Sequence, residues 1–368
     1  MSSESGLAIE LVEPDELAAT TYPLPEQLKQ EGILVEMKAA TACGSDMHSW
    51  RGRRPFPMPS VLGHEVVGEI ASLGSSVRTD TAGNPLSVGD RITWTVMASC
   101  NDCRYCRLEN MPQKCTDLFK YGHERSDERP HFNGGFAEYV HVIPGTAVFK
   151  LPSGVPSAVA STLMCAGATV AAGLDRMDLD PMDSLVVQGA GMLGLYAISM
   201  ASVYGADRII AVDIDTERLR MAERFGADST LDANELTDTE IVDQVKEKTG
   251  GRGADAAFEV TGAPEVIPTG VELLATGGEY MLHGSVYPGD TFTLDGHDVI
   301  TKNLSIQGSH NYDAQHLATA IEFADRYRDR YPLESLVGPS FPLSVDGVQQ
   351  ALSALENREA IRPVIRPD

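Results

Sequence analysis

A glycine-rich loop between an apolar run and a helical run constrains the fold of this chain more than any other feature. It follows the apolar residues 184–188 and opens residues 192–204, which have a helical pattern. In such a strand–loop–helix unit the first glycine allows a tight turn, the second lets a diphosphate approach the backbone, and the third lets helix and strand pack closely. The diphosphate of a dinucleotide would lie at the helix N-terminus, where backbone amides favour negative charge. The predicted loop consists of Gly189, Ala190, Gly191, Met192, Leu193 and Gly194.

Apolar runs and helical runs alternate around this loop. Such alternation with short connections builds a parallel sheet that helices cover on both faces. Asp213 ends the second strand, where a carboxylate accepts hydrogen bonds from an adenosine ribose and repels a 2′-phosphate. No arginine follows it immediately, so the sequence favours NAD over NADP. The expected strands are 184–188, 208–212, 255–260 and 279–283, and the expected helices are 156–177, 192–204, 216–225, 234–249 and 264–275.

The first 150 residues instead contain short strands and turns without this alternation, which predicts a β-barrel-like domain. After residue 309 the alternation stops, and the end of the chain is expected to pack on the first domain. The predicted fold class is α/β, with one domain formed by residues 1–165 and 309–368 and a second by residues 166–308. The expected strands of the first domain are 32–38, 66–70, 91–97 and 361–365, and a glycine turn leads into a further strand within 134–140. Its expected late helices are 315–328 and 345–356.

Four of the six cysteines lie close together, which is typical of a metal site. Cys100, Cys103 and Cys106 are separated by two residues each, and Cys115 follows after eight more. Four thiolates bind zinc in a closed tetrahedral shell, so this lobe, at about residues 97–118, is predicted to hold a structural zinc ion. An iron–sulfur cluster is the alternative, because CxxCxxC also suits clusters, but the fourth cysteine is not in a CxxxCP arrangement.

The two remaining cysteines, Cys43 and Cys165, are predicted to bind a second zinc ion together with His64. Two thiolates and one imidazole leave the fourth position of zinc open for water or a substrate oxygen, as in catalytic zinc sites. Cys43 begins the stretch Cys43-Gly44-Ser45-Asp46-Met47-His48, and Glu65 directly follows His64.

The overall charge limits the partners of the chain. There are 29 Lys+Arg against 53 Asp+Glu, a formal net charge of −24. This charge repels nucleic acid and anionic membranes, so we expect neither as a partner. The acidic surface serves solubility or reflects growth in high salt.

No apolar run reaches about 18 residues, and the first ten residues lack the pattern of a secretory signal, so we expect a cytoplasmic protein with reduced thiols.

Together these motifs resemble those of zinc-dependent medium-chain alcohol dehydrogenases, over nearly the whole chain. The resemblance implies a GroES-like, β-rich catalytic domain built from both chain ends and a Rossmann domain that binds NAD. We also expect a homodimer or homotetramer. The motifs that carry the resemblance are the stretch from Cys43 to His48, Gly63-His64-Glu65, the four-cysteine lobe, Cys165 followed by Thr169, the nucleotide loop with Asp213, and Ile361-Arg362.

The resemblance assigns roles around the catalytic zinc. Cys43, His64 and Cys165 match the family's zinc ligands. Glu65 matches a carboxylate behind the zinc that is sometimes a transient ligand. Asp46 matches the carboxylate that hydrogen-bonds the ligand histidine and fixes its tautomer.

The resemblance also assigns proton transfer and cofactor binding. Ser45 and His48, whose ordinary pKa is about 6.5, match a relay from the substrate hydroxyl to solvent. Arg218 and Arg362 match positions that contact the adenosine ribose and the diphosphate, and Thr169 lies where the family contacts nicotinamide. In this family zinc lowers the pKa of a bound alcohol, and the alkoxide gives up hydride to nicotinamide. We therefore expect interconversion of an alcohol and an aldehyde or ketone, with NAD and two zinc ions per chain.

Several features bear on the type of dehydrogenase. Many family members have seven residues between the third and fourth lobe cysteines, whereas this chain has eight, so we expect a slightly altered lobe. Polyol and threonine dehydrogenases often have glutamate as the third catalytic ligand. Cys165 therefore favours the alcohol dehydrogenase type, and a sorbitol- or threonine-type enzyme is the alternative. A non-catalytic NAD-binding protein of the same fold is a third interpretation, against which the complete ligand set argues.

An unusual segment at residues 120–132 bears on the substrate. With Arg51, Arg53 and Arg54 it resembles a subgroup often associated with phosphonate metabolism. Arginines near the pocket would suit an anionic substrate, and the competing interpretation is that they are solvated loop charges. His123 and His131 are expected to pin the loop rather than to bind metal.

Overall fold

The computed structural model describes residues 4–286 and 288–367, and the chain divides into two compact units. Both chain ends belong to unit 1, and unit 2 is formed by the residues between them. Unit 1 consists of Met1–Ala168, Tyr312–Arg328 and Leu333–Asp368, and unit 2 of Thr169–Asn311 and Asp329–Pro332.

Unit 2 is built on a parallel sheet with the strand order β12-β11-β10-β13-β14-β15. Counted from β10 as the first strand, this is the 3-2-1-4-5-6 order of a Rossmann fold, which confirms the predicted doubly wound sheet. Ligands of such sheets bind at the carboxyl ends of the strands, where the order reverses, here between β10 and β13. The strands are β10 (Ser184–Gln188), β11 (Arg208–Asp213), β12 (Ser229–Asp232), β13 (Ala254–Glu259), β14 (Leu274–Leu282) and β15 (Ser305–Gly308).

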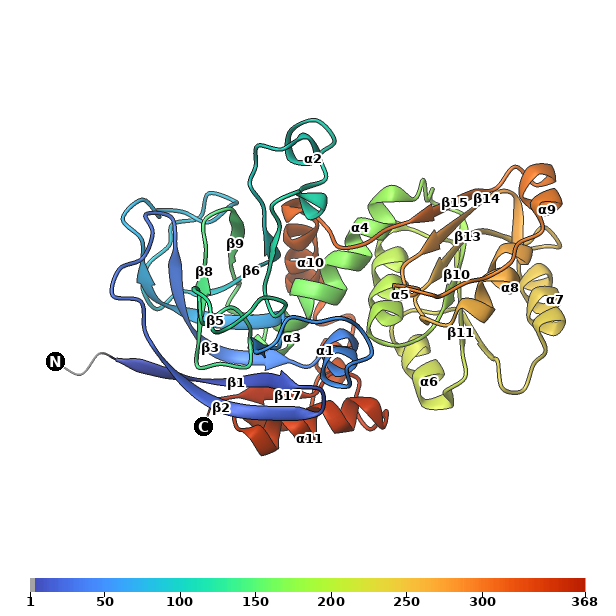
Figure 1. Cartoon of the computed structure of the whole chain (residues 1–368). Helices are drawn as coiled ribbons and strands as arrows, with labels where there is room; N and C mark the ends of the chain where they lie inside the picture. Colours follow the sequence, from blue (N-terminus) through green and yellow to red (C-terminus); the bar gives the residue numbers. More distant parts are fainter. Residues whose placement is uncertain (1–3, 287, 368) are drawn as a thin grey trace. The chain divides into compact units, whose positions relative to one another are not determined.

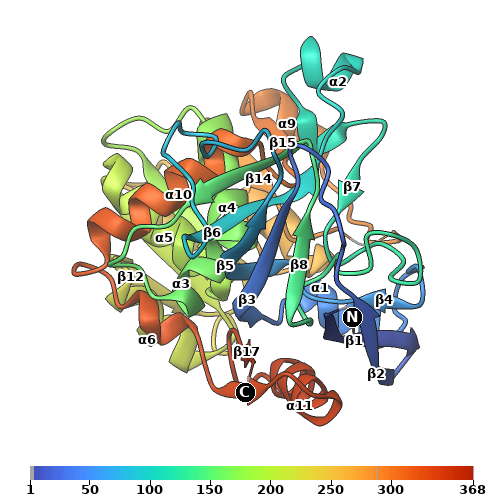
Figure 2. The same ribbon diagram turned by 90° about the vertical axis from the view of Figure 1, so that its left-hand side faces the viewer.

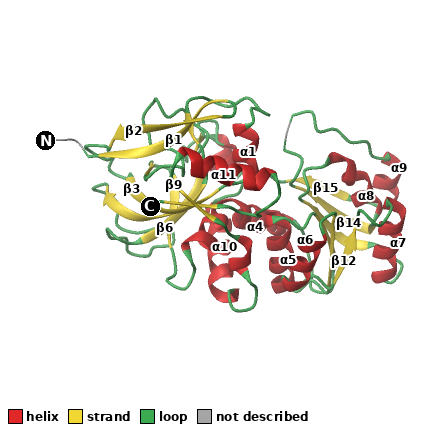
Figure 3. Cartoon of the chain, turned by 90° about the horizontal axis from the view of Figure 1, so that it is seen from below, coloured by secondary structure: helices red, strands yellow, loops and turns green. Residues whose placement is uncertain are grey.

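Helices cover both faces of this sheet, with α5 and α6 on one face and α7, α8 and α9 on the other (Figure 3). Helix α5 is buried over most of its length and ends at Gly205, whose φ of 101° is a left-handed conformation that glycine adopts without strain. The helices are α4 (Ala168–Arg176), α5 (Met192–Tyr204), α6 (Thr216–Arg224), α7 (Asp238–Lys248), α8 (Ile267–Glu272) and α9 (Gly296–Thr301).

Unit 1 is rich in β-structure. Its larger sheet has the order β16-β17-β3-β5-β6-β7, with β8 on β3 and β9 on β6, and a smaller sheet has the order β2-β1-β4. Strands β3, β5, β6 and β8 are seen side by side in Figure 2. Strand β17 pairs antiparallel with β3, so the end of the chain joins a sheet that its beginning forms. The strands are β1 (Ser5–Glu13), β2 (Glu16–Pro23), β3 (Ile33–Thr41), β4 (Ser60–Val61), β5 (Glu65–Leu73), β6 (Arg91–Ala98), β7 (Phe119–Lys120), β8 (Tyr139–Val142), β9 (Thr146–Lys150), β16 (Ser340–Pro342) and β17 (Val364–Arg366).

Short helices connect and flank these sheets. Helix α2 belongs to a lobe that extends from unit 1 (Figure 1). The helices of unit 1 are α1 (Gly44–Trp50), α2 (Arg104–Arg107), α3 (Ser157–Thr162), α10 (Ala314–Tyr327) and α11 (Val345–Glu356).

The expected helix over residues 156–177 forms as Ser157–Arg176, but it is not regular. A π turn, Leu163–Gly167, separates α3 from α4. The hydroxyls of Ser161 and Thr162 bond back to carbonyls of the preceding turn, which loosens a regular helix. The run Ser157–Arg176 also has the length and hydropathy of a membrane span, although no such run was expected from the sequence. However, 83% of its apolar window is buried inside the molecule.

Other element bounds also differ from expectation. The strand expected to follow the glycine turn at Gly134 and Gly135 begins only at Tyr139. The two glycines pass so close to other backbone and side-chain atoms that a Cβ would lie 2.0 and 2.4 Å from them. Helix α7 begins at Asp238, after a Thr237 cap that accepts a hydrogen bond from the Glu240 amide. Strand β14 begins at Leu274, inside the expected helix 264–275.

Candidate active site

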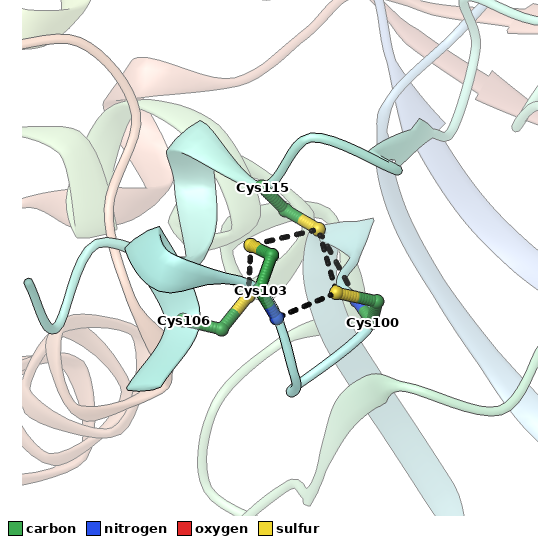
Figure 4. A group of neighbouring side chains, drawn as sticks. All are labelled: Cys100, Cys103, Cys106 and Cys115. Carbon is green, nitrogen blue, oxygen red and sulfur yellow. Dashed lines mark hydrogen bonds between the residues drawn. The ribbon is translucent and has the colours of Figure 1, made fainter. Parts of the chain in front are cut away.

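The four lobe cysteines lie around one point (Figure 4). The sulfur–sulfur separations are 3.4 Å for Cys100 and Cys115, 3.5 Å for Cys103 and Cys106, and 4.0 Å for Cys103 and Cys115. Zinc–sulfur bonds of about 2.3 Å in a tetrahedron would place the sulfurs about 3.8 Å apart. The donor set therefore fits a structural zinc ion, and the longer segment before Cys115 does not open the lobe.

Backbone amides in this lobe also favour the thiolate form of its cysteines. The amides of Asp102 and Cys103 donate to the sulfur of Cys100, and those of Cys100 and Asp117 donate to the sulfur of Cys115. Hydrogen bonds of this kind stabilise the negative charge of a thiolate.

Replacing Cys106 by serine should remove this zinc and lower the stability of unit 1, because a structural zinc ion contributes its binding free energy to folding. We expect zinc content to fall by about one ion per chain and the thermal unfolding temperature to fall with it. Metal analysis and calorimetry measure both changes. Iron with visible absorption in the unaltered protein would instead support the iron–sulfur alternative.

The residues predicted to hold the catalytic zinc come together in unit 1 from distant parts of the sequence. One donor atom each from Cys43, His64, Glu65 and Cys165 lies within 4.8 Å of the others. Cys43 precedes α1, His64 precedes β5, and Glu65 is the first residue of β5. Cys165 lies in the middle of the π turn.

Asp46 makes three hydrogen bonds at this cluster. One of its carboxylate oxygens lies 3.1 Å from His64 Nδ1 and accepts from the Gly63 amide at 3.1 Å, and the other accepts from the Cys43 amide at 2.9 Å. A hydrogen bond from Nδ1 leaves the lone pair of His64 on Nε2, the atom that would bind zinc. Asp46 and His64 are 1% and 2% exposed, so solvent does not compete.

Glu65 and Arg362 form a buried ion pair behind the cluster. Arg362 Nε lies 3.0 Å from Glu65 Oε2, and Arg362 Nη2 lies 3.3 Å from Cys43 Sγ. The structure thus places Arg362 at the metal cluster, and its predicted contact with a diphosphate stays a prediction. Glu65 Oε1 is buried and has no hydrogen-bond partner among the described residues, which is an arrangement that suits a nearby cation.

Charge in the cluster favours a metal-binding thiolate. The pKa of Cys43 is held well below its ordinary value by a hydrogen bond from Cys165 and by the positive charge of Arg362. The pKa of Cys165 is raised by the same hydrogen bond and by burial. Burial raises the pKa of Glu65 to about 7 despite Arg362. Two thiols, the Nε2 of an imidazole and an unpartnered carboxylate oxygen fit zinc well.

The two predicted relay residues lie on α1. Ser45 Oγ is 3.3 Å from His64 Nε2, so this hydroxyl lies beside a ligand atom. Burial and the charges of Arg53 and Arg54 lower the pKa of His48, which therefore holds a proton less tightly than the ordinary value implies. Transfer of a proton between Ser45 and His48 stays a prediction.

The three arginines after α1 differ in their partners, and so in how far they are available to a substrate. Arg51 pairs with Asp15 at 2.7 Å and with Glu356, and Arg53 pairs with Glu356 at 2.8 Å. These two arginines therefore tie α1 to the end of α11. Arg54 instead turns toward the cluster, where it donates to the carbonyl of Ser45 and to the Ser49 hydroxyl.

Sequence reasoning missed the contact between the segment 120–132 and the metal cluster. Gly122 packs on Gly63 so closely that a Cβ would lie 2.7 Å from its carbonyl oxygen. The ring of His123 lies edge-on to His64 at 5.3 Å, accepts from Arg54 at 3.1 Å and donates from Nδ1 to the Tyr121 carbonyl. His123 thus pins this loop, as expected, but beside His64, a predicted zinc ligand. The unusual sequence at residues 120–123 was the signal that could have indicated this contact.

Lys120 is a second residue in this segment that the sequence did not single out. Burial lowers its pKa, and its charge acts on Cys165, Cys43 and Asp46. No hydrogen bond or ion pair of its ammonium group is found among the residues that the structure describes. His131 lies elsewhere in the segment, stacked on Tyr22 at 4.4 Å, and pins the loop through the Ser126 carbonyl.

The nucleotide loop has the expected geometry in unit 2. Gly189 has a φ of +99°, and its amide donates to the Val212 carbonyl. A Cβ on Gly194 would lie 1.8 Å from the Gly189 carbonyl oxygen, so only glycine allows α5 to approach the strand. A Cβ on Gly191 would meet nothing closer than 3.8 Å, so open space lies over this backbone, as a diphosphate requires. The first amides of α5, at Met192 and Leu193, lack helical acceptors and are available to an anion.

The remaining predicted cofactor residues lie around this loop or at the edge of unit 2. Asp213 accepts from the amides of Ala190 at 2.6 Å and Asp215 at 2.9 Å, which places its carboxylate beside the loop. An Arg218 guanidinium nitrogen lies 3.8 Å from the position of a Gly191 Cβ. Thr169 lies half-buried in α4, and its contact with nicotinamide stays a prediction.

Comparison with known proteins agrees with both units. A family model described as "Alcohol dehydrogenase GroES-like domain" matches residues 29–153, and one described as "Zinc-binding dehydrogenase" matches residues 193–326. The chain is 35% identical to 5-exo-hydroxycamphor dehydrogenase of Pseudomonas putida, over 91% of each chain. It is 28% identical to L-threonine 3-dehydrogenase of Aeromonas salmonicida, over 95% of each.

Solved structures show the same similarity. An alcohol dehydrogenase from Thermotoga maritima has a TM-score of 0.94 and 30% identity, with coverage of 99% of this chain and 100% of that one. A dehydrogenase of Escherichia coli at 25% identity was solved with NADH, with a TM-score of 0.83 and coverage of 98% and 99%. The matched domains, the cysteine and histidine cluster and the dinucleotide loop lead to one conclusion: this chain belongs to the zinc-dependent medium-chain alcohol dehydrogenases and is an oxidoreductase that interconverts alcohols and carbonyl compounds with zinc and a nicotinamide dinucleotide.

Proposed function

We propose that unit 1 binds the catalytic and structural zinc ions and the substrate, that unit 2 binds NAD in preference to NADP, and that the substrate is an alcohol oxidised to an aldehyde or ketone. The observation that carries the proposal is the cluster of the buried Cys43 and His64 with the half-buried Cys165, whose donor atoms lie within 4.8 Å of one another. These three residues would hold zinc with one position open. Zinc bound there would supply a Lewis acid for the substrate oxygen.

The protein's own residues prepare this chemistry. Asp46 keeps the lone pair of His64 on Nε2, and Arg362 balances the charges of Cys43 and Glu65. Ser45 would accept the proton of the substrate hydroxyl, and His48, with its lowered pKa, would release it to solvent. In unit 2 the Asp213 carboxylate would repel the 2′-phosphate of NADP.

Lys120 favours a second candidate, an alcohol with an anionic tail such as a carboxylate or phosphonate. Its charge acts on the cysteines of the cluster, and a half-buried ammonium group with no ion-pair partner among the described residues is costly. An anionic substrate would compensate that cost. The cluster itself suits either class of alcohol, and so it does not choose between them. Polyols and amino alcohols are the further alternatives.

A panel of alcohols with and without anionic tails, read by NADH absorbance with NAD and with NADP, tests these candidates. We expect oxidation of some alcohols, with kcat/KM at least about tenfold higher for NAD. If the second candidate holds, Lys120→Met should raise KM for anionic alcohols and leave neutral ones unchanged. No NADH formation with any alcohol, and no NADH consumption with the matching carbonyls, would contradict the proposal.

We also propose a cytoplasmic homodimer or homotetramer. Strand β15 stands last in the sheet order of unit 2, and an edge strand of this kind is free to pair with a second copy. The exposed apolar side chains of Phe292 and Ile300, in the segment that leads into β15, support an interface.

A further inference from the structure

The backbone around Cys165 is irregular. Helices α3 and α4 are joined by the π turn Leu163–Gly167, and Cys165 is its central residue. A π turn contains one residue more than an α-helical turn, so it shifts the direction of the side chains that it carries. The position of Cys165 therefore depends on what holds this turn in its wider form.

Strand β6 is also irregular where it passes the same region of unit 1. Its register with β9 shifts between Trp94 and Ala98, and Val96 lies within the shift. The Val96 amide does not point to a strand neighbour but donates to the hydroxyl oxygen of Tyr312 at 3.0 Å. One side chain thus satisfies a backbone group that the irregular strand leaves available.

Tyr312 joins the two irregular segments. Its hydroxyl donates to the carbonyl of Met164, the residue before Cys165, in addition to accepting from Val96. The side chain is 1% exposed and lies just before α10, whose residues also pack on the π turn: a Cβ on Gly167 would lie 3.3 Å from the Ala320 Cβ. Burial raises the pKa of Tyr312 well above its ordinary value, so the hydroxyl keeps the proton that it donates.

We propose that Tyr312 is a positioning residue for the catalytic zinc, because its hydroxyl fixes the π turn that presents Cys165 to Cys43 and His64. Tyr312 touches none of the reacting groups and acts through the Met164 backbone. This inference rests on the proposed zinc site. It assigns the third ligand a support through the neighbouring backbone, whereas Asp46 supports His64 through a bond to the ring itself.

The test is the rate at which a chelator removes each zinc ion from Tyr312→Phe. This variant keeps the buried ring and removes only the hydroxyl. Loss of an outer partner of a zinc ligand weakens metal binding about 10- to 100-fold, so we expect release of the catalytic zinc at least about tenfold faster. Release of the lobe zinc should not change, which makes the lobe an internal reference.

Tyr280→Phe is the matched control. Tyr280 is also 1% exposed, and its hydroxyl donates to Gln188 at 2.6 Å in unit 2, so the variant loses a comparable buried hydrogen bond. We expect it to release both zinc ions at the rates of the unaltered protein. Cobalt in the catalytic site gives a second reading, since its absorption spectrum should shift in Tyr312→Phe and not in Tyr280→Phe.

Unchanged zinc release and an unchanged cobalt spectrum in Tyr312→Phe would overturn the proposal, and so would equally faster release from both sites. If Tyr312→Phe does not fold, 4-aminophenylalanine at position 312 restores a donor, and it must then restore slow zinc release. Chelator release is measured without turnover. If the unaltered protein held no zinc at Cys43, the proposed zinc site itself would be wrong, and this outcome is distinct from failure of the Tyr312 role.

Discussion

Cys43→Ser is expected to lose alcohol oxidation almost completely while it keeps the fold and NADH binding. Cys43 supplies a thiolate to the cluster of unit 1, and its pKa is already lowered for this role. Serine is a poor zinc ligand, so the variant should lose the catalytic zinc. The lost charge stabilisation of several kcal/mol corresponds to a decrease in kcat/KM of at least about 10³-fold. Turnover by NADH absorbance and binding by NADH fluorescence measure the two effects separately.

Cys106→Ser provides the control for this result, because both variants exchange one cysteine for serine in a four-donor cluster. Each variant should lose one zinc ion. Only Cys43→Ser should lose alcohol oxidation with little change in stability. If Cys43→Ser kept full activity, the catalytic role of the Cys43 cluster would be refuted. If it lost NADH binding as well, the division of roles between unit 1 and unit 2 would be wrong.

Alanine at Gly191 or at Gly194, two of the three glycines of the nucleotide loop, should separate cofactor binding from folding. In Gly191→Ala the added Cβ has 3.8 Å of clearance, so the free energy of unfolding should change by less than about 0.5 kcal/mol. The same Cβ would occupy the space that the diphosphate needs, and we expect NADH affinity to fall at least about tenfold. Calorimetry and NADH fluorescence titration measure the two quantities.

Gly194→Ala should behave differently, because its Cβ would lie 1.8 Å from the Gly189 carbonyl oxygen and α5 must move away from the strand. We expect a loss of about 3 kcal/mol or more in stability, or about 6 to 12 °C in unfolding temperature, together with loss of NADH binding. Equal stability of the two variants would contradict the close packing of helix on strand. Unchanged NADH affinity in Gly191→Ala would place the diphosphate elsewhere.

The parts of the molecule that could be predicted from sequence are those whose determinants are local. The nucleotide loop lies within six consecutive residues, between a strand and a helix whose patterns are themselves local, and helix α5 has the predicted bounds. The four-cysteine lobe is equally local. The catalytic cluster needed more, because Cys43 and Cys165 are far apart in sequence. They were connected as the two cysteines outside the lobe, and the family resemblance then supported that connection.

The parts that could not be predicted depend on contacts between distant segments. Arg362 meets Glu65 and Cys43 only because β17 pairs with β3. The π turn interrupts a run whose apolar spacing predicts a continuous helix, and its tie to Tyr312 spans 148 residues of sequence. His123 and Lys120 reach the cluster through a loop with no regular periodicity. Sequence patterns report on residues that are neighbours along the chain, whereas these contacts join residues that are far apart in it.

The most direct test of the account is the zinc content of the unaltered protein, followed through removal by a chelator alongside alcohol oxidation and NADH binding. The account predicts two zinc ions per chain and no iron. Alcohol oxidation should disappear with the zinc ion of the Cys43 cluster, while NADH binding is kept. Full activity in protein that retains only the lobe zinc would contradict it.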